Sequence, residues 1–349
     1  MGTSELKEMR AAYVETIVDL AKKDRNIVVL EADLMSCTNT GSFRAAYPDR
    51  FYNMGISEAN MIGVAAGLSA AGKIPFAATF ACFATRRVYD QFFISANYAR
   101  LNVKLVGTDP GVTAAFNGGT HMPFEDLALM RVIPGLTVLE PSDPWSCAAF
   151  TRLAAERYGC VYLRFSRKPV PVLYSEGDEF PIGKARLLKG GKDLCFVALG
   201  SLMVNESLKA RELLAKEGID AGVLDVLSLK PIDREGILEQ ASQVKGIISA
   251  ENHQIIGGLG SAVAEVLAEA GFRGKFARIG IRDEFGEVGT QDYLTRRFGL
   301  DAETLAAKAR ELLAKPRPGP ARGGKNRGVL SGKYPGRPLF ATLLLMPTA

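Results

Sequence analysis

The chain has 349 residues, enough for about two domains, and 47% of them are hydrophobic and 23% charged, which excludes a disordered or fibrous protein. Its net charge of +5 depends on residues 316–349, where six basic residues and no acid occur, so residues 1–315 carry about −1. Because this body is not basic, we expect no nucleic-acid surface on it. Residues 316–349 are rich in Gly and Pro, which predicts a disordered tail outside the folded unit.

Several other classes are excluded by simple patterns. No apolar run reaches the ~18 residues that a membrane span needs, and the N-terminus has no secretory-signal pattern, so we predict a cytoplasmic protein without a membrane segment. The five cysteines are scattered and never spaced as C-x-x-C, which predicts reduced, mostly buried thiols. The two histidines, His121 and His253, lie far apart in the chain, so we predict no metal ligands in this sequence.

Apolar residues at helical spacing alternate with short apolar runs through the first half of the chain. Between residues 4 and 23, Leu6, Met9, Tyr13 and Ile17 follow one stripe of a helix. The expected order is helix 4–23, strand 26–33, helix 58–71, strand 74–80, helix 85–98, strand 103–109, helix 124–132, strand 137–139, helix 143–157 and strand 160–166. Strands that alternate with helices predict a mainly parallel sheet covered on both faces.

A stretch rich in Pro, Gly and acids at 169–183 interrupts this pattern and marks the predicted domain boundary. Beyond it we expect strand 194–200, helix 203–217, strand 221–226, a short helix after Pro231, strand 246–251, helix 259–270 and strand 276–281. The predicted fold class is α/β, with two doubly wound domains at 1–175 and 184–315, of which the second is the smaller.

Loops that follow strands are the first places to search for a site, because open α/β sheets bind ligands outside the carboxyl ends of their strands. Glu58 opens a helix that is otherwise poor in charge. One interpretation is structural, since a Ser followed by an acid favours a helix N-terminus. The other is a carboxylate among apolar neighbours, which a bound ligand would have to compensate by hydrogen bonding and which suits proton transfer.

A pair of aromatic residues follows the strand at 74–80. Phe80 and Phe83 are either core residues or an apolar wall against which a heteroaromatic ring can pack. Because the segment 79–87 comes directly after a strand, it lies at the edge of the sheet where ligands bind. The residues alone leave both interpretations open.

Two Gly-rich segments are further candidates. His121 lies on a loop beside Asn117, a position that is either structural or suited to substrate binding. Gly257, Gly258 and Gly260 open a helix whose N-terminus could bind an anion. That segment lacks the G-x-G-x-x-G order, however, and close packing of the helix explains its glycines as well.

Four segments together resemble the pyrimidine-binding and C-terminal domains of transketolases. They are, in chain order, GISEANMIGVAAGLSAAGKIPFAATFACF, NGGTHMPFEDLALMRVIPGLTVLEPSD, YLRFSRK and ENHQIIGGLGSAVAE. The resemblance covers residues 4–313 approximately, and it is specific because all four segments recur together. It implies a two-domain α/β chain that uses thiamine diphosphate.

The resemblance also implies roles at the cofactor. Glu58 matches the glutamate that hydrogen-bonds the aminopyrimidine ring nitrogen and favours the imino tautomer, which deprotonates the thiazolium carbon. Phe80 and Phe83 match aromatic residues around the aminopyrimidine, with Phe83 as the expected stacking partner. Asp33 matches an acidic position near the cofactor.

Other matched positions concern the substrate. His121 matches a catalytic-site histidine that contacts the oxygens of the sugar, and Arg167 matches an arginine that pairs with the sugar phosphate. Asn117 stands where the family commonly has an aspartate that reads substrate hydroxyls, and Arg86 stands where a tyrosine is frequent. These departures leave the identity of the donor and acceptor sugars open.

The sequence has no counterpart of the family's Gly-Asp-Gly segment and following Asn, which contact the metal ion and the diphosphate. Its only Gly-Asp pair, Gly177–Asp178, lies in the predicted linker. We therefore expect a split transketolase, in which a separate N-terminal subunit supplies the ligands of Mg²⁺ (or Ca²⁺) and the assembly is an α₂β₂ heterotetramer. The complex would transfer a two-carbon ketol unit between phosphorylated sugars.

Three alternatives stay open. The beta subunit of the first component of a 2-oxo-acid dehydrogenase shares this architecture, although the Thr120-His121-x-Pro123 segment and Arg167 favour a sugar phosphate. A deoxyxylulose-phosphate-synthase-like enzyme normally carries its diphosphate domain in the same chain. A noncatalytic paralogue would have kept the fold and lost the activity, against which Glu58 argues.

Overall fold

A computed structural model of the chain describes residues 5–314. Within this range the first sheet has seven strands, in the spatial order β12 (Ser228–Lys230), β6 (Thr137–Leu139), β7 (Val161–Phe165), β5 (Lys104–Thr108), β4 (Ile74–Phe80), β2 (Ile27–Glu31) and β3 (Phe51–Asn53). All neighbouring pairs are parallel except β12 with β6. The central strands are buried along their whole length, as the continuous apolar runs predict for a sheet covered on both faces.

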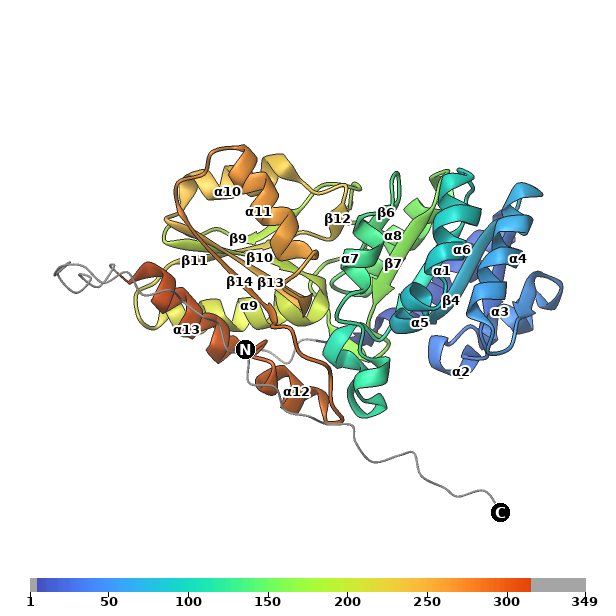
Figure 1. Cartoon of the computed structure of the whole chain (residues 1–349), viewed down its shortest axis with the longest axis horizontal. Helices are drawn as coiled ribbons and strands as arrows, with labels where there is room; N and C mark the ends of the chain where they lie inside the picture. Colours follow the sequence, from blue (N-terminus) through green and yellow to red (C-terminus); the bar gives the residue numbers. More distant parts are fainter. Residues whose placement is uncertain (1–4, 315–349) are drawn as a thin grey trace, which may run out of the picture. The chain divides into compact units, whose positions relative to one another are not determined.

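Helices cover both faces of this sheet (Figure 1). One face packs against α1 (Met9–Lys23), α3 (Gly41–Ala46) and α8 (Pro144–Glu156). The other face packs against α4 (Glu58–Ala70), α5 (Ala81–Arg86), α6 (Tyr89–Gln91), the π-helical segment Phe92–Tyr98 and α7 (Asp126–Arg131). The short α2 (Met35–Thr38) and the 3-10 turn Pro48–Arg50 lie in the connection from β2 to β3.

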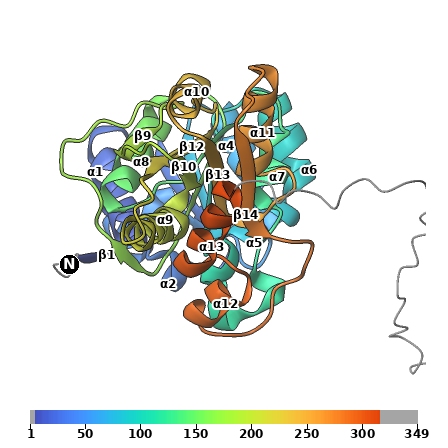
Figure 2. The same ribbon diagram turned by 90° about the vertical axis from the view of Figure 1, so that its left-hand side faces the viewer.

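The second sheet has five strands, in the order β14 (Lys275–Ile281), β13 (Gly246–Gln254), β10 (Leu194–Leu199), β11 (Ala221–Asp225) and β9 (Arg186–Lys189). Only β9 runs antiparallel to its neighbour. One face carries α9 (Gly200–Ala215) and α13 (Ala302–Leu313), and the other carries α10 (Arg234–Gln243) and α11 (Leu259–Glu269), as Figures 1 and 2 show. The predicted α/β class, with helices on both faces of two mainly parallel sheets, is therefore confirmed.

The two halves are joined by one strand that crosses between them and by a shared apolar core. β12 comes from the second half in sequence but extends the first sheet by pairing with β6. Within the first half, β1 (Leu6–Glu8) forms a separate antiparallel pair with β8 (Pro169–Pro171), at the start of the predicted linker. One apolar core is shared between the first sheet and the helices α10 and α11. The domain division at 175 and 184 remains a proposal.

Two predicted helices differ from the structure. The helix expected at 4–23 begins only at Met9, because residues 6–8 form strand β1, which pairs with β8. The helix expected at 85–98 begins at Ala81, directly after β4, and is broken into α5, α6 and the π-helical segment. The predicted tail at 316–349 lies outside the described residues.

The remaining global expectations concern thiols and membranes. All five cysteines are free, and four of them are buried, as predicted. Among residues 5–314, no helix combines the length and the apolar character that crossing a bilayer requires.

Candidate functional site

Four of the predicted site residues lie where strands of the first sheet end. β2, β4, β5 and β7 are parallel neighbours, so their carboxyl ends meet at one edge. Asp33 follows β2, Phe80 ends β4, Phe83 lies in α5, and Arg167 follows β7. The chain reverses its direction of travel across the sheet between β2 and β4, and such switch points are where open α/β sheets bind ligands.

Glu58 is the first residue of α4, and its side chain is only 5% exposed. The Arg87 guanidinium donates a hydrogen bond from Nη1 to Glu58 Oε1 over 2.7 Å. Ser57, at the N-cap of α4, makes no capping bond with its side chain. The carboxylate is thus directed at the segment after α5 rather than at its own helix, which favours the functional interpretation over the structural one.

Aromatic rings continue from this ion pair. The Arg87 guanidinium lies over the ring of Phe83, with 3.8 Å between Cζ and the ring centroid. The centroid of Phe83 is 6.0 Å from that of Phe80 and 5.2 Å from that of His121, whose imidazole meets it edge-on. Glu58, Phe80, Phe83, Arg87 and His121 therefore form one contiguous group, which we call the Glu58 cluster.

His121 ends the 3-10 turn Gly119–His121 and is half-buried. Its Nδ1 lies 2.9 Å from the hydroxyl of Thr120. Partial burial, together with the nearby guanidinium groups of Arg87 and Arg86, lowers the pKa of His121 below its ordinary value. The imidazole is therefore neutral near pH 7 and can accept or donate one hydrogen bond to a sugar oxygen.

Arg86, which stands where the family often has tyrosine, holds the His121 turn in place. Its Nη2 donates to the carbonyl oxygen of Thr120 over 2.7 Å, and its Nε lies 3.2 Å from Glu125 Oε1. The residue therefore connects α5 to the loop that carries His121.

Arg167 lies beside the Glu58 cluster and is already paired with a carboxylate. Its Nε is 2.7 Å from Asp109 Oδ2, and its guanidinium lies 5.2 Å from the ring centroid of Phe80. Asp109 is 1% exposed, and its burial raises the pKa of the carboxyl to about 6 despite the arginine. Asp109 also has a φ of 56°, a strained backbone conformation of the kind found at functional sites. The sequence interpretation missed it.

The structure does not join Asp33 and Asn117 to the Glu58 cluster. Asp33 is exposed and exchanges two hydrogen bonds with Asn53, one through its backbone N–H and one through Oδ1. Asn117 is half-buried in the 3-10 helix Gly111–Asn117. Within residues 5–314, neither makes a hydrogen bond, ion pair or ring contact with the cluster, so their predicted roles remain proposals.

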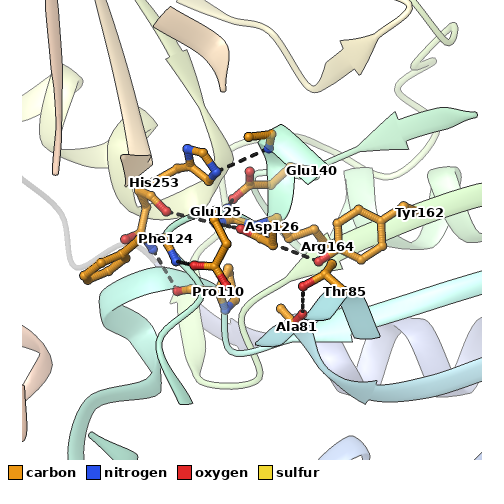
Figure 3. Close-up of polar contacts among 12 residues, drawn as sticks. Ala81, Thr85, Pro110, Phe124, Glu125, Asp126, Glu140, Tyr162, Arg164 and His253 are labelled. Carbon is orange, nitrogen blue, oxygen red and sulfur yellow. Dashed lines mark hydrogen bonds and ion pairs between the residues drawn. The ribbon is translucent and has the colours of Figure 1, made fainter. Parts of the chain in front are cut away.

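A second polar group, which the sequence did not predict, lies buried between the two halves of the chain (Figure 3). Arg164, in β7, is fully buried and donates to both carboxylate oxygens of Asp126 and to Glu140 over 2.6–3.2 Å. It also donates to the backbone carbonyl of Asn252 in β13 over 2.9 Å, and Tyr162 donates to Asp126 over 2.9 Å. We call these five residues the Arg164 network.

The Arg164 network fixes the segment that follows His121. Asp126 opens α7, directly after that loop, and the Phe124 carbonyl accepts a hydrogen bond from Gln254 N–H over 2.9 Å. His253 is fully buried and accepts from the Ala128 N–H, and burial lowers its pKa to about 4 (Figure 3). Polar contacts from the second half of the chain thus hold α7, and with it the loop before it.

The glycines that open α11 do not leave an anion site. The carboxylate of Glu251 accepts hydrogen bonds from the N–H groups of Leu259 and Gly260 over 2.7 and 2.8 Å. A side chain at Gly258 would collide with that carboxylate. The structure therefore corrects the anion-binding candidate: a carboxylate of the chain itself occupies the helix N-terminus, and Gly258 makes room for it.

The Glu58 cluster fits the pyrimidine half of thiamine diphosphate. Between Glu58 and Phe83, the Arg87 guanidinium shows that a planar group with N–H donors can contact the carboxylate and the ring face together. An aminopyrimidine is also planar and bears nitrogen atoms. In the described part of the chain, no three His, Cys, Asp or Glu side chains gather as a metal site.

Comparisons with known proteins identify both halves of the chain. Residues 6–172 match the family model "Transketolase, pyrimidine binding domain", and residues 183–305 match "Transketolase, C-terminal domain". The 6-deoxy-6-sulfo-D-fructose transketolase subunit SqwH of Clostridium sp. (strain MSTE9) is 49% identical over 87% of this chain and 94% of its own length. The putative transketolase C-terminal section of Methanocaldococcus jannaschii is 42% identical over 88% of this chain and 97% of its own length.

A solved structure is similar over the same extent. A split-gene transketolase, described as an inactive beta4 tetramer, superposes with a TM-score of 0.81 at 45% identity, covering 88% of this chain and 98% of that one. Two matched domain models and relatives of this similarity show that the chain belongs to the transketolase family, with a pyrimidine-binding domain followed by a transketolase C-terminal domain.

Proposed function

We propose that this chain acts as the C-terminal subunit of a thiamine-diphosphate-dependent transketolase and that Glu58 binds the aminopyrimidine of the cofactor. The observation that carries the proposal is the Glu58 cluster, where a carboxylate only 5% exposed and an aromatic ring face both contact one planar nitrogen group. Phe83 would stack on the pyrimidine, and Phe80 would support Phe83 from behind. When bound, the cofactor supplies the carbon nucleophile for transfer of a two-carbon ketol unit.

The substrates that fit best are sugars with an anionic group. Arg167 lies beside the cluster with a flat guanidinium suited to a phosphate, and Asp109 orients it. His121, neutral near pH 7, would contact sugar oxygens, and Asn117 would contact a hydroxyl. We therefore propose a ketose phosphate as donor and an aldose phosphate as acceptor.

A sulfonated sugar is the second candidate donor. The relative that is 49% identical is named for 6-deoxy-6-sulfo-D-fructose. A sulfonate offers three oxygen acceptors, as a phosphate does, and therefore suits the same guanidinium. Parallel assays with D-fructose 6-phosphate and 6-deoxy-6-sulfo-D-fructose as donors distinguish the two, because the preferred donor will have the higher kcat/KM.

A partner subunit is part of the proposal. The matched domains are the pyrimidine-binding and C-terminal domains, so the ligands of the diphosphate and of Mg²⁺ (or Ca²⁺) would come from an N-terminal transketolase subunit in an α₂β₂ assembly. Apolar side chains are exposed in and beside the segment 116–121, which ends at His121, as expected where another chain will cover them. They are Phe116, Phe285 and Val288.

The alternatives are less well supported. Both matched family models are transketolase domains, which favours a transketolase over the beta subunit of a 2-oxo-acid dehydrogenase. One measurement distinguishes an enzyme from a noncatalytic paralogue. In an enzyme, two-carbon transfer by the complex depends on Glu58 of this chain.

Substitution of Glu58 tests the proposal. In the reconstituted complex with an N-terminal subunit, Glu58→Gln should reduce the turnover of two-carbon transfer by about 10²–10⁴, because proton transfer through the cofactor ring is lost. A matched control is Glu217→Gln, which alters an exposed ion pair with Arg310 outside the Glu58 cluster and should leave turnover unchanged. Unchanged turnover of Glu58→Gln would contradict the catalytic assignment.

A further inference from the structure

Arg87 makes the two contacts that the proposed function assigns to the cofactor. Its guanidinium donates to Glu58 over 2.7 Å and lies over the face of Phe83 at 3.8 Å. These are the carboxylate and the ring assigned to the aminopyrimidine. Among residues 5–314, the Arg87 side chain makes no other hydrogen bond, ion pair or ring contact, and its positive charge also acts to lower the pKa values of His121 and Cys82.

The two groups are chemically alike. A guanidinium is planar, stacks on aromatic faces and donates through N–H groups in its own plane. An aminopyrimidine shares the flat shape and the in-plane nitrogen atoms. A carboxylate that is 5% exposed also needs a partner, because a buried unpaired charge is costly. Arg87 therefore meets the same requirement that the cofactor would meet.

The Arg87 side chain can rotate away from Glu58 and Phe83 while the backbone around it stays in place. It is 47% exposed, so its outer atoms reach solvent. Its neighbours in the chain are firmly held, since Val88 is fully buried in the core and Thr85 is buried with its hydroxyl bonded to the Ala81 carbonyl. Rotation of one side chain is enough to expose Glu58 and the face of Phe83.

We propose that Arg87 is a stand-in ligand, which closes the Glu58–Phe83 site in the cofactor-free chain and is displaced when the aminopyrimidine binds. The inference rests on the proposed function, because it takes Glu58 and Phe83 to be the pyrimidine contacts. Arg87 is then a positioning residue rather than a catalytic one. It keeps the Glu58 carboxylate paired and in place, and it lowers the apparent affinity for the cofactor by competing with it.

Cofactor affinity tests this directly. In the complex with an N-terminal transketolase subunit and saturating Mg²⁺, thiamine diphosphate is titrated by isothermal calorimetry. Arg87→Met, which keeps the aliphatic length and removes the charge, should lower the Kd by about 5- to 20-fold, as expected for loss of a half-exposed ion pair and a cation–π contact in the competing state. Arg87→Lys should have a smaller effect, because an ammonium still pairs with Glu58.

A matched control exists in the chain. Arg186 pairs with Asp178 at 3.2 Å, lies over the ring of Phe180 at 5.6 Å and is 40% exposed, far along the chain from the cluster. Arg186→Met should leave the Kd unchanged. Thermal unfolding gives a second readout: without cofactor, Arg87→Met should lower the midpoint by about 2–4 °C, and saturating cofactor should abolish that difference. The difference caused by Arg186→Met should persist with and without cofactor.

The outcomes separate this inference from the proposed function. If Glu58→Gln weakens cofactor binding but Arg87→Met leaves the Kd unchanged, the proposed displacement of Arg87 by the cofactor is wrong, and the proposed function stands. If Arg87→Met weakens binding, Arg87 is a ligand in the loaded state, which also overturns the displacement. If Glu58→Gln has no effect on the Kd, both ideas fail together.

Discussion

Two arginine–carboxylate groups in this chain differ strongly in the burial of their arginine. Arg164 is 0% exposed, holds two carboxylates and joins the two halves of the molecule, whereas Arg87 is 47% exposed and holds one. In our proposal, the same pair of functional groups serves architecture at Arg164 and ligand exchange at Arg87, because water can replace a partner only where the pair reaches solvent. Buried ion pairs are costly to break on one side, while exposed ones are worth little. The difference explains why we treat one group as fixed and the other as displaceable.

The largest expected effect concerns the buried arginine. Arg164→Met leaves Asp126 and Glu140 without their cation, and it should lower the free energy of unfolding by about 3–5 kcal/mol. The measurement is the free energy of unfolding from urea titration, compared with that of Arg87→Met, which should fall by only about 1–2 kcal/mol, the energy that corresponds to its 5- to 20-fold effect on the Kd. If both variants lost the same free energy of unfolding, the distinction between a fixed Arg164 and a displaceable Arg87 would fail.

Neutralising the two carboxylates sharpens this test. Burial raises the pKa of Glu140 to about 7 even beside Arg164, so that carboxyl gives up its charge readily. The triple variant Arg164→Met, Asp126→Asn, Glu140→Gln should recover part of the stability lost by Arg164→Met alone. No recovery would show that the arginine acts through packing rather than through charge.

The next effect concerns a buried carboxyl that is paired with hydroxyl groups rather than a cation. Glu31, at the end of β2, is fully buried and accepts from Thr38 and Thr40 over 2.6 and 2.8 Å. Burial raises its pKa to about 7. The folded chain therefore retains a proton that the unfolded chain releases at about pH 4.3, and the stability from this group is lost as the pH rises through about 7.

Glu31→Gln keeps a neutral side chain at every pH and removes that loss. Relative to the parent chain, the variant should gain about 2–3 kcal/mol of stability between pH 5 and pH 8. Urea midpoints at the two pH values measure the gain. A constant difference between variant and parent would mean that Glu31 is ionised across the whole range, and that a buried carboxylate here does without a cation.

The smallest expected effect compares the two histidines. His121 is half-buried beside the aromatic rings, so His121→Asn should raise the KM for the sugar phosphate about 10-fold through a lost hydrogen bond, with little change in stability. His253 is fully buried and accepts from the Ala128 N–H, so His253→Asn should lower stability and leave KM unchanged. Steady-state kinetics give the KM of both variants, and urea midpoints give their stability. If His121→Asn lowered stability and His253→Asn raised the KM, the roles assigned to the two histidines would be wrong.

The elements and the strand-end position of the cluster could be predicted from sequence, since apolar periodicity is local. The pairing of distant strands could not be predicted. β12 joins β6 across some 90 residues, and β1 pairs with β8 across some 160, so nothing within either segment reveals its partner. The break of the helix expected at 85–98 was also missed, although α5 begins where β4 ends.

The site was predicted in part. Glu58, Phe80, Phe83 and His121 come together, and a family resemblance carried that expectation. Arg87 escaped notice because an arginine after a helix is usually solvated, and only geometry places its guanidinium on Phe83. For Arg164 a signal did exist: a charged residue in the middle of a fully buried strand requires buried partners, and its partners come from distant segments.

The most direct test of the account is a structure of the complex with an N-terminal subunit and bound thiamine diphosphate. We expect the aminopyrimidine ring against Phe83, a ring nitrogen within hydrogen-bond distance of Glu58, and the Arg87 guanidinium displaced from both. A structure in which the cofactor is bound while Glu58 and Arg87 stay paired would contradict the central claim, that this carboxylate serves the pyrimidine half of the cofactor.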